Sequence, residues 1–564
     1  MRKKIIFYGI FGLTIIAMLI AMILIPLTIS KELGGRLGYE LKEVYTVDHI
    51  LYFTVARGIL QGSKPYADFY ENKPPLIFLL CALSYAIRGD FHLINIFSFI
   101  SLLLMIAIPV AYLIYKCIKN KANPLIFLMM ALPVISITLI ITLYTEVRSG
   151  EAQTELFGAV SSMAALLCIL LGRDDDKFYS PTVIISGFFL GVAAMFKEPH
   201  AVLLVVLMMM LVKNKRDIFT KVLFPLGYAV QTILLILICS NCLDSYFTIY
   251  LKNMFSSHIN LYGSPFIRAF NLANLVTDMK NYAEYMPHLV GILLLTVILT
   301  FAFKVVVEQD LKQRIYKMMR FMVLLLGLYT TGFVVGLGGQ YFNHHYVFAI
   351  PFYFTLMFIC IDELPVEKVR LFANLPDDKL IDNPSIVYSS ILFAIAVFSV
   401  PLSIKTYSTN SNKYHQDTSV VEKVKGMKEL ASYIDEICDA LDEEHYLFLG
   451  FNGYHMYGYS KHMPYGPIFA QDRYNFSDPD SFFAKSFLEN LYETNILVYY
   501  RNNTGSISMV VDRYIQKEFT TRVPAAVEGI EMPVTVDSKN YKMMYRSKTY
   551  GLDYIDPIDP GDSK

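Results

Sequence analysis

The sequence predicts a polytopic α-helical membrane protein with about eleven transmembrane helices, a long first outer loop and a C-terminal soluble α/β domain. Of the 564 residues, 55% are hydrophobic and only 17% are charged, and the mean hydropathy is +0.43. A chain this apolar cannot bury all of its apolar surface in one water-soluble globule. The net charge is +0, so no global positive field indicates a nucleic-acid partner.

The transmembrane helices are predicted from apolar runs bounded by charged or turn-forming residues. These runs cover about residues 5–29, 91–115, 123–144, 153–171, 180–196, 199–212, 219–240, 287–303, 321–338, 345–361 and 385–403. The first run follows Arg2, Lys3 and Lys4, which predicts a cytoplasmic N-terminus by the positive-inside rule. No small-residue cleavage site follows it, so we expect a membrane anchor rather than a removed signal peptide.

A shorter apolar piece, PPLIFLLCALSYAI at 74–87, decides on which side every later loop lies. If this piece does not span, most Lys and Arg residues between Lys116 and Lys379 face the cytoplasm, as the positive-inside rule requires. The later outer loops then keep only Arg148, Lys197, Lys252, Arg268 and Lys280. We therefore expect a membrane-dipping or juxtamembrane helix, a first outer loop at about 30–90, and a tail that lies outside the cytoplasm.

The tail reads as a separate soluble domain, which divides the chain into residues 1–404 and 405–564. Apolar residues recur at helical spacing over 420–441, and 446–451 and 496–500 read as buried strands. A crossover helix is expected over 482–493. The tail shows no nucleophile elbow, Gly-rich phosphate loop or zinc-ligand spacing.

Ionisable residues crowd the stretch VDHILYFTVARGILQGSKPYADFYENKPPL at 47–76. Outside the cytoplasm there is no supply of ATP or nucleotide sugar, so a group transfer there needs an activated donor carried by a lipid phosphate. A site for such a donor needs cations at membrane level and one carboxylate that faces the acceptor. This stretch supplies both.

The order of these motifs resembles the GT-C membrane glycosyltransferases. The resemblance covers about residues 5–405 and is strongest in VDHILYFTVARGILQG, ENKPPLIFLL, TELFGAV and GFFLGVAAMFKEP. It is closest in pattern to the protein O-mannosyltransferases, the lipid A aminoarabinose transferase and bacterial enzymes that use polyprenyl-phosphate sugars. It implies a plasma-membrane enzyme that transfers a sugar from a polyprenyl-phosphate donor to a glycan, lipid or protein acceptor of the cell envelope.

Asp48 matches the catalytic acidic residue of this family and is our candidate general base. Where the family usually has a second acidic residue, this chain has His49, which argues against a two-carboxylate metal site and is a candidate substrate-binding residue. Asp48 also suits a helix N-cap, a role that is compatible with catalysis. One carboxylate is sufficient, because a phosphate leaving group needs no proton.

Three basic residues are candidates for binding the donor. Lys73 in NKPP and Lys197 in FKEP resemble the two phosphate-contacting lysines of the family. The alternative for each is a lysine that snorkels at a helix end. Arg57 is a secondary candidate, which would pair with Glu71 or contact phosphate.

Glu155 and a histidine pair complete the candidate site. Glu155 opens a predicted span where the family often has an acidic residue that supports the acceptor or a divalent metal, although the helix dipole alone also favours it. His344 and His345 lie on an expected outer turn, where His345 would bind acceptor or phosphate or simply be solvated. A divalent metal cofactor remains open, and Asp174, Asp175 and Asp176 read as a solvated cytoplasmic turn.

Two other function classes remain open. A flippase or transporter of lipid-linked sugars would also gather charges near the membrane, but it should show repeated halves or broken helices at the midplane. This chain instead shows a single long first outer loop, no evident repeat and charges concentrated at the outer interface. A non-catalytic membrane assembly protein would tolerate substitution of Asp48. The sugar, the acceptor and the prenyl chain carry no motif that the sequence reveals.

Overall fold

The computed structural model describes residues 47–119, 152–172, 177–254, 308–336, 343–363, 419–449, 453–469 and 480–500, with short pieces between 131 and 142, between 294 and 306, and at 521–522 and 541–545. The chain forms two compact units. The helical unit comprises Met1–Leu41, Asn95–Ile236 and Ile259–Gln416, and the mixed unit comprises Lys42–Ile94, Leu237–His258 and Asp417–Lys564.

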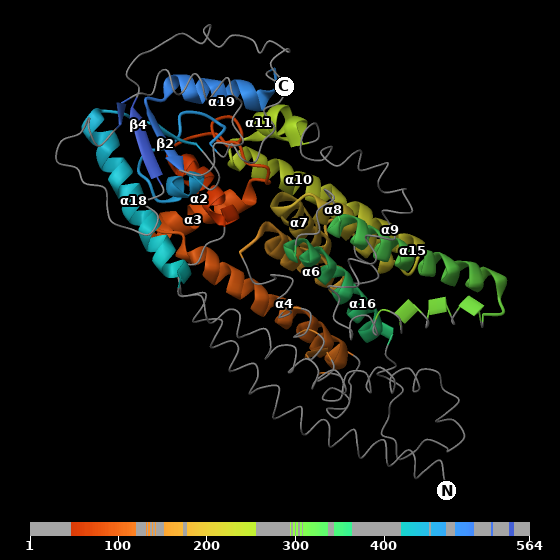
Figure 1. Cartoon of the computed structure of the whole chain (residues 1–564). Helices are drawn as coiled ribbons and strands as arrows, with labels where there is room; N and C mark the ends of the chain where they lie inside the picture. Colours follow the sequence, from red (N-terminus) through yellow and green to blue (C-terminus); the bar gives the residue numbers. More distant parts are fainter. Residues whose placement is uncertain are drawn as a thin grey trace, which may run out of the picture. The chain divides into compact units, whose positions relative to one another are not determined.

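The helical unit contains most of the long apolar helices (Figure 1). Its described elements are α4 (His92–Lys119), α6 (Thr154–Leu171), α7 (Pro181–Phe196), α8 (Pro199–Met210), α9 (Lys215–Ile218), the π-helix η2 (Phe219–Leu223), α10 (Phe224–Cys239), α15 (Leu311–Val335), the 3-10 helix η6 (Asn343–Phe348) and α16 (Ala349–Glu363). They agree closely with seven of the predicted spans. The predicted spans at 5–29, 123–144, 287–303 and 385–403 lie wholly or mostly outside the described residues.

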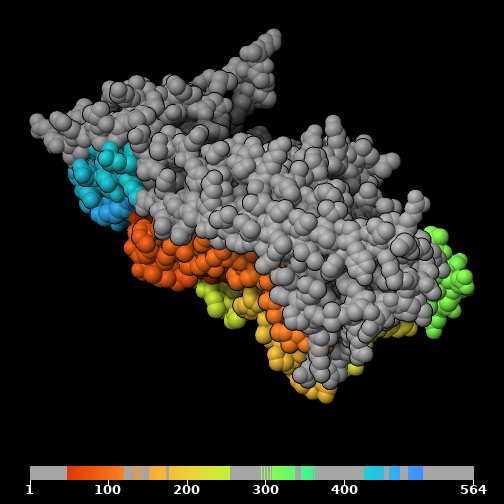
Figure 2. All heavy atoms as spheres, turned by 90° about the horizontal axis from the view of Figure 1, so that it is seen from below, coloured from red at the N-terminus to blue at the C-terminus, as the bar shows by residue number. Residues whose placement is uncertain are grey.

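Within the described ranges, four helical segments are long and apolar enough to cross a membrane: His92–Lys119, Thr154–Leu171, Lys215–Cys239 and Leu311–Val335. Shorter apolar helices occupy 76–88, 181–196, 199–210 and 344–359. The outward faces of α4 and α10 are largely apolar, as lipid requires. The exposed apolar residues of α4 include Ile100, Leu103, Leu104, Ile114 and Ile118. The colour bar of Figure 2 gives this helix in orange.

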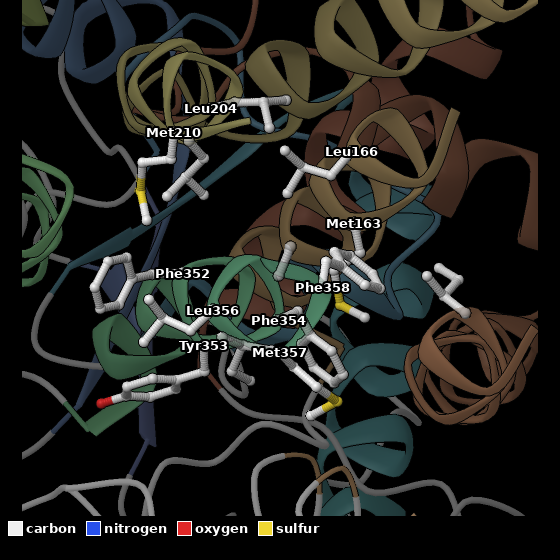
Figure 3. Packing of buried hydrophobic residues seen from close by; sticks show 14 of the residues in the cluster. Met163, Leu166, Leu204, Met210, Phe352, Tyr353, Phe354, Leu356, Met357 and Phe358 are labelled. Atoms are coloured by element: carbon white, nitrogen blue, oxygen red, sulfur yellow. The ribbon is translucent and has the colours of Figure 1, made fainter. Parts of the chain in front are cut away.

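The core of the helical unit lies between α6, α8, α15 and α16 (Figure 3). Phe352 of α16 is fully buried and its ring lies near Gly327 of α15 and Met210 of α8. A Cβ at Gly327 would lie only 2.6 Å from the Met210 sulfur. The absent side chain therefore lets α15 and α8 pack closely, as small residues do between membrane helices.

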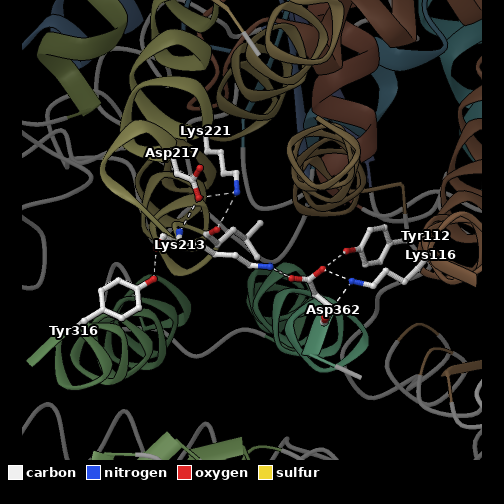
Figure 4. A network of polar contacts seen from close by, with 8 residues as sticks. Tyr112, Lys116, Lys213, Asp217, Lys221, Tyr316 and Asp362 are labelled. Carbon is white, nitrogen blue, oxygen red and sulfur yellow. Dashed lines mark hydrogen bonds and ion pairs between the residues drawn. The ribbon is translucent and has the colours of Figure 1, made fainter. Parts of the chain in front are cut away.

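Polar side chains join three helical segments at one end of this unit (Figure 4). Asp362 accepts hydrogen bonds from Lys116 Nζ at 2.6 Å and from Tyr112 Oη at 3.2 Å, and it also pairs with Lys213. Lys213 donates its backbone N–H to Asp217 at 2.7 Å. One carboxylate thus links α4 and α16 to the turn between α8 and α9.

The mixed unit combines helices with a small sheet. Its described elements are α2 (Val47–Leu60), α3 (Leu76–Arg88), α11 (Leu243–Ser245), the π-helix η3 (Tyr246–Leu251), α18 (Ser419–Leu441), β1 (Tyr446–Leu449), the 3-10 helix η8 (Gly453–Gly458), α19 (Phe482–Glu493), β2 (Ile496–Tyr500), β3 (Thr521–Arg522) and β4 (Tyr541–Tyr545). The strand order is β1-β2-β4-β3. β1 and β2 are parallel, with Tyr446 opposite Ile496, and the other pairs are antiparallel.

The elements predicted for the tail are present. The helix expected over 420–441 is α18, the expected strands are β1 and β2, and α19 lies between them in the chain. The apolar piece at 74–87 forms α3, which ends at Gly89 in the left-handed conformation with φ +74°. Thirteen helical residues extend about 20 Å, which is shorter than the hydrocarbon core of a bilayer.

The C-terminal segment packs directly on the predicted first outer loop. Tyr70 donates its backbone N–H to Pro467 O at 2.9 Å, and Ile50 of α2 lies against Gly458 of η8. Ser245, which belongs to the Leu237–His258 segment of this unit, donates a hydrogen bond from its Oγ to Pro65 O at 2.7 Å. The loop is therefore held by two segments that lie far from it in sequence.

Candidate functional site

The loop after α2 folds back onto its own helix because Gly58 leaves room for it. A Cβ at Gly58 would lie 2.4 Å from the ring of Phe69, so only glycine permits this approach. Gly62, in the turn that follows α2, has φ +93°, a conformation that side chains disfavour. Asp68 then closes the turn by accepting the backbone N–H of Lys64 at 2.7 Å. These contacts set the path that leads the chain to Lys73.

Asp48 lies in the first turn of α2 and is half-buried. A carboxylate there interacts favourably with the helix dipole. Its neighbour His49 is buried, and its ring lies 6.2 Å from that of Tyr52 and 6.3 Å from that of Phe53. The two adjacent residues thus differ in exposure, and Asp48 is the more accessible of them.

Arg57 is buried at the last turn of α2. Its Nη1 donates to Tyr457 O at 3.3 Å, and its guanidinium lies 5.8 Å from the ring centroid of Tyr85. The partner that the sequence suggested, Glu71, is fully buried in the following loop. The structure thus gives Arg57 a contact to the C-terminal segment, which a sequence pattern could not reveal across 400 residues.

Lys73 is half-buried just before α3. Its Nζ donates to Asn72 Oδ1 at 3.2 Å, and its carbonyl oxygen accepts a hydrogen bond from Tyr66 Oη at 2.8 Å. Tyr66 itself is buried against Tyr246 and Tyr250. Aromatic packing therefore fixes the backbone of Lys73, while its ammonium bonds a neighbouring side chain.

In the helical unit, Glu155 and Lys197 form an ion pair. Glu155 lies in the first turn of α6 and is fully buried, and the Lys197 side chain is 16% exposed. The second carboxylate oxygen of Glu155 accepts a hydrogen bond from Thr154 Oγ1 at 2.9 Å. Lys197 lies between α7 and α8, as predicted from its place between two apolar segments. The sequence suggested both residues separately but gave no sign of their pairing.

His200 is a buried residue that sequence reasoning missed. Its Nε2 donates to Glu155 O at 3.2 Å, and its Nδ1 lies 3.5 Å from the hydroxyl of Ser162. The ring fits against Gly158, where a Cβ would lie 2.2 Å from Cδ2. The available signal was a histidine directly after Pro199, the proline that opens an otherwise apolar helix.

His344 and His345 lie in η6, directly before α16, and both are half-buried. Their rings are 4.6 Å apart. One ring nitrogen of each histidine and one carboxylate oxygen of Glu155 lie within 4.8 Å of one another. Phe348 at the end of η6 lies 4.6 Å from the His200 ring. The structure thus brings together Glu155, Lys197 and the histidine pair, which the sequence had placed in separate loops.

The candidate residues divide between the two units. Glu155, Lys197 and His345 gather in the helical unit, whereas Asp48, His49, Arg57 and Lys73 belong to the mixed unit. The acidic triplet Asp174–Asp176 lies outside the described residues. The roles that the sequence suggests for these residues remain predictions.

Comparison with known proteins agrees with the resemblance. Residues 72–242 match the family model described as dolichyl-phosphate-mannose-protein mannosyltransferase. No curated protein matches the sequence. The structure of this chain is similar to the crystal structure of ArnT from Cupriavidus metallidurans bound to undecaprenyl phosphate, with a TM-score of 0.50 and 13% sequence identity. The match covers 92% of this chain and 97% of the ArnT chain.

Weaker likenesses extend to two other solved structures. The oligosaccharyltransferase of Archaeoglobus fulgidus has a TM-score of 0.41 and 12% identity, over 87% of this chain and 70% of that one. The arabinofuranosyltransferase AftD from Mycobacteria has a TM-score of 0.44 and 10% identity, over 93% of this chain and 40% of that one. The family model over residues 72–242 and the fold shared with ArnT confirm the resemblance to the GT-C membrane glycosyltransferases that the sequence motifs predicted.

Proposed function

We propose that this glycosyltransferase transfers a sugar from a polyprenyl-phosphate donor to a cell-envelope acceptor outside the cytoplasm. The observation that carries the proposal is the placement of Lys197, a cation held by buried Glu155 between two apolar helices. A lipid phosphate at the membrane interface needs such a fixed cation. The undecaprenyl phosphate bound to ArnT, which shares the fold, supports a donor of this chemical class.

The proposed arrangement in the membrane follows the charge pattern. About eleven helices span, the N-terminus is cytoplasmic, and the first outer loop at about 30–90 and the C-terminal segment from 405 lie outside. Packing of the C-terminal segment on α2 and the loop after it supports a shared side for the two. Asp48, Lys73 and Lys197 would then all face the compartment of the acceptor.

The reaction requires one proton acceptor. A hydroxyl oxygen of the acceptor attacks the anomeric carbon of the sugar while the bond from that carbon to the phosphate oxygen breaks. The hydroxyl proton passes to the Asp48 carboxylate, and the electron pair of the broken bond leaves with polyprenyl phosphate. The leaving phosphate gains one negative charge, so cations near it stabilise the transition state more than the ground state.

Lys73 and Lys197 are the proposed cations for this phosphate. Arg57 supports α2 through its bond to Tyr457 O and is a secondary candidate for the donor. His49 and His345 are the remaining candidates for substrate binding, with His345 beside Glu155 and His49 next to Asp48. Glu155 orients Lys197 and is the alternative base.

The test is transfer from a polyprenyl-phosphate sugar in detergent by the wild type and by Asp48→Asn. Asparagine keeps the shape of the side chain but removes its proton affinity, so turnover should fall by about a hundredfold to ten-thousandfold. Donor binding and melting should change little. Asp68→Asn is the matched control, because this exposed carboxylate caps a turn in the same loop. Near-normal sugar transfer by the Asp48→Asn variant would exclude Asp48 as the base and indicate Glu155 instead.

A further inference from the structure

We infer that Glu155, His344 and His345 form a binding site for one divalent transition-metal ion, and that this ion competes with Lys197 for the Glu155 carboxylate. Among the residues that the structure describes, these are the one group of three such side chains whose ligand atoms converge. The inference extends the proposed function, since it concerns the same Lys197. Metal binding can nevertheless be measured without donor or acceptor.

The chemistry of the three ligands selects the class of metal. Two imidazole nitrogens and one carboxylate oxygen suit Zn²⁺, Co²⁺ or Mn²⁺, whereas Mg²⁺ and Ca²⁺ prefer sets made of oxygen alone. Ligands about 2.0–2.2 Å from a tetrahedral ion lie about 3.3–3.6 Å from one another. The atoms lie within 4.8 Å at present, so closure needs shifts of about 1–2 Å, which side-chain rotation provides.

The surroundings of Glu155 hold it in position for such a role. Thr154 Oγ1 donates to one carboxylate oxygen at 2.9 Å, and His200 donates to its backbone carbonyl at 3.2 Å. The His200 ring also contacts Phe348, four residues beyond His344. Partners of this kind orient metal ligands and tune their affinity. The same set of contacts links the carboxylate to the segment that carries both histidines.

Lys197 gives the proposed site a distinctive property. Its ammonium pairs with the other oxygen of the Glu155 carboxylate, so this carboxylate already has a cation partner. A divalent ion at the three ligands would lie beside that ammonium and repel it strongly in a buried setting. Binding of the ion therefore displaces Lys197 from Glu155, and the released ammonium can then reach a phosphate. The two cations exclude each other, and only one holds the carboxylate at a time.

The experiment measures metal affinity in the purified full chain after chelator treatment. Zn²⁺ binding is followed by competition with a chromophoric chelator, and Co²⁺ binding by its visible absorption spectrum. The wild type should bind one ion, whereas Glu155→Gln and the double variant His344→Ala with His345→Ala should lose it. Lys197→Met removes the competing ammonium and should bind at least about tenfold more tightly.

His462→Ala is the matched control, because it removes an imidazole of the C-terminal segment that bonds Asp439 rather than Glu155. Its metal affinity should equal that of the wild type. Unchanged affinity in Glu155→Gln, or unchanged or weaker affinity in Lys197→Met, would overturn the inference. Should Lys197→Met fail to fold, Zn²⁺ must still raise the melting temperature of the wild type but not that of Glu155→Gln. The absence of that difference would also refute the site.

Discussion

Replacing Gly158 by alanine should push the imidazole of His200 out of its place. The new Cβ would lie 2.2 Å from Cδ2 and 2.5 Å from Nε2 of that ring, whereas carbon atoms in contact lie about 3.5–4.0 Å apart. The ring must therefore move by more than about 1 Å. Phe348 lies 4.6 Å away on another element, so a movement of this size disturbs further packing.

The magnitude follows from three contributions. Overpacking a well-filled interior costs about 1–3 kcal/mol, and loss of the hydrogen bond from His200 to Glu155 O costs about 1 kcal/mol. The better helix propensity of alanine returns up to about 1 kcal/mol. We expect a net destabilisation of about 1–4 kcal/mol. The measurement is unfolding in mixed detergent micelles. Gly227→Ala is the control, because its Cβ would meet only Phe178 at 3.8 Å.

A double variant tests the cause directly. If the clash with the imidazole is responsible, Gly158→Ala should cost little in a chain that already carries His200→Ala, since the space is then empty. The two single effects should therefore not add. Additive free energies of unfolding in the double variant, or a Gly158→Ala variant as stable as Gly227→Ala, would refute the assigned packing of His200.

Three further predictions concern charges. Lys73→Ala should raise the KM for the donor, whereas Lys73→Arg should keep part of the activity because a cation remains. Lys64→Ala, at an exposed lysine of the same loop, is the control. Equal losses of activity in the two Lys73 variants would indicate a packing role for Lys73 instead. Asp362→Asn should destabilise the protein by about 1–3 kcal/mol, since it leaves Lys116 and Lys213 without their anion. The measurement is thermal melting or unfolding in mixed detergent micelles, and a variant as stable as the wild type would contradict the role of this network. The hydrogen bond from Lys461 lowers the pKa of Asp439. This hydrogen bond therefore stabilises the fold fully at pH values above the pKa of an aspartate in the unfolded chain, about 3.9. The melting difference from Asp439→Asn should therefore be constant near neutral pH and shrink below about pH 4; a difference independent of acid would refute it.

The sequence predicts the apolar helices well because lipid imposes one dominant pattern on them. The expected run at 153–171 is α6 (Thr154–Leu171), and 180–196 is α7 (Pro181–Phe196). Local signals also place the α7 end correctly: Pro199 follows Lys197 and starts a new helix, as proline does at a first turn. The strands of the tail were readable for the same reason, since a short buried apolar run leaves few alternatives.

The contacts that build the candidate site were not readable. Glu155 and Lys197 are separated by 42 residues, and no periodicity links two charges that meet only after three helices have packed. Arg57 shows the same limit, because its acceptor is a backbone carbonyl of Tyr457 and backbone groups leave no trace in a sequence. His200 was overlooked since one polar residue in an apolar helix looks incidental until the space at Gly158 is known.

The buried Glu155–Lys197 pair also bears on how the chain is made. A charged residue that enters lipid alone costs up to about 2.5–3.5 kcal/mol at the centre of a span, and each of these residues lies at the end of an apolar helix. Lys197 is synthesised 42 residues after Glu155, which takes about 2–8 s at ordinary rates of translation. During this interval α6 carries an uncompensated carboxylate. We expect α6 to wait beside the insertion machinery until α7 and the start of α8 arrive, so that the three helices enter the membrane as one unit.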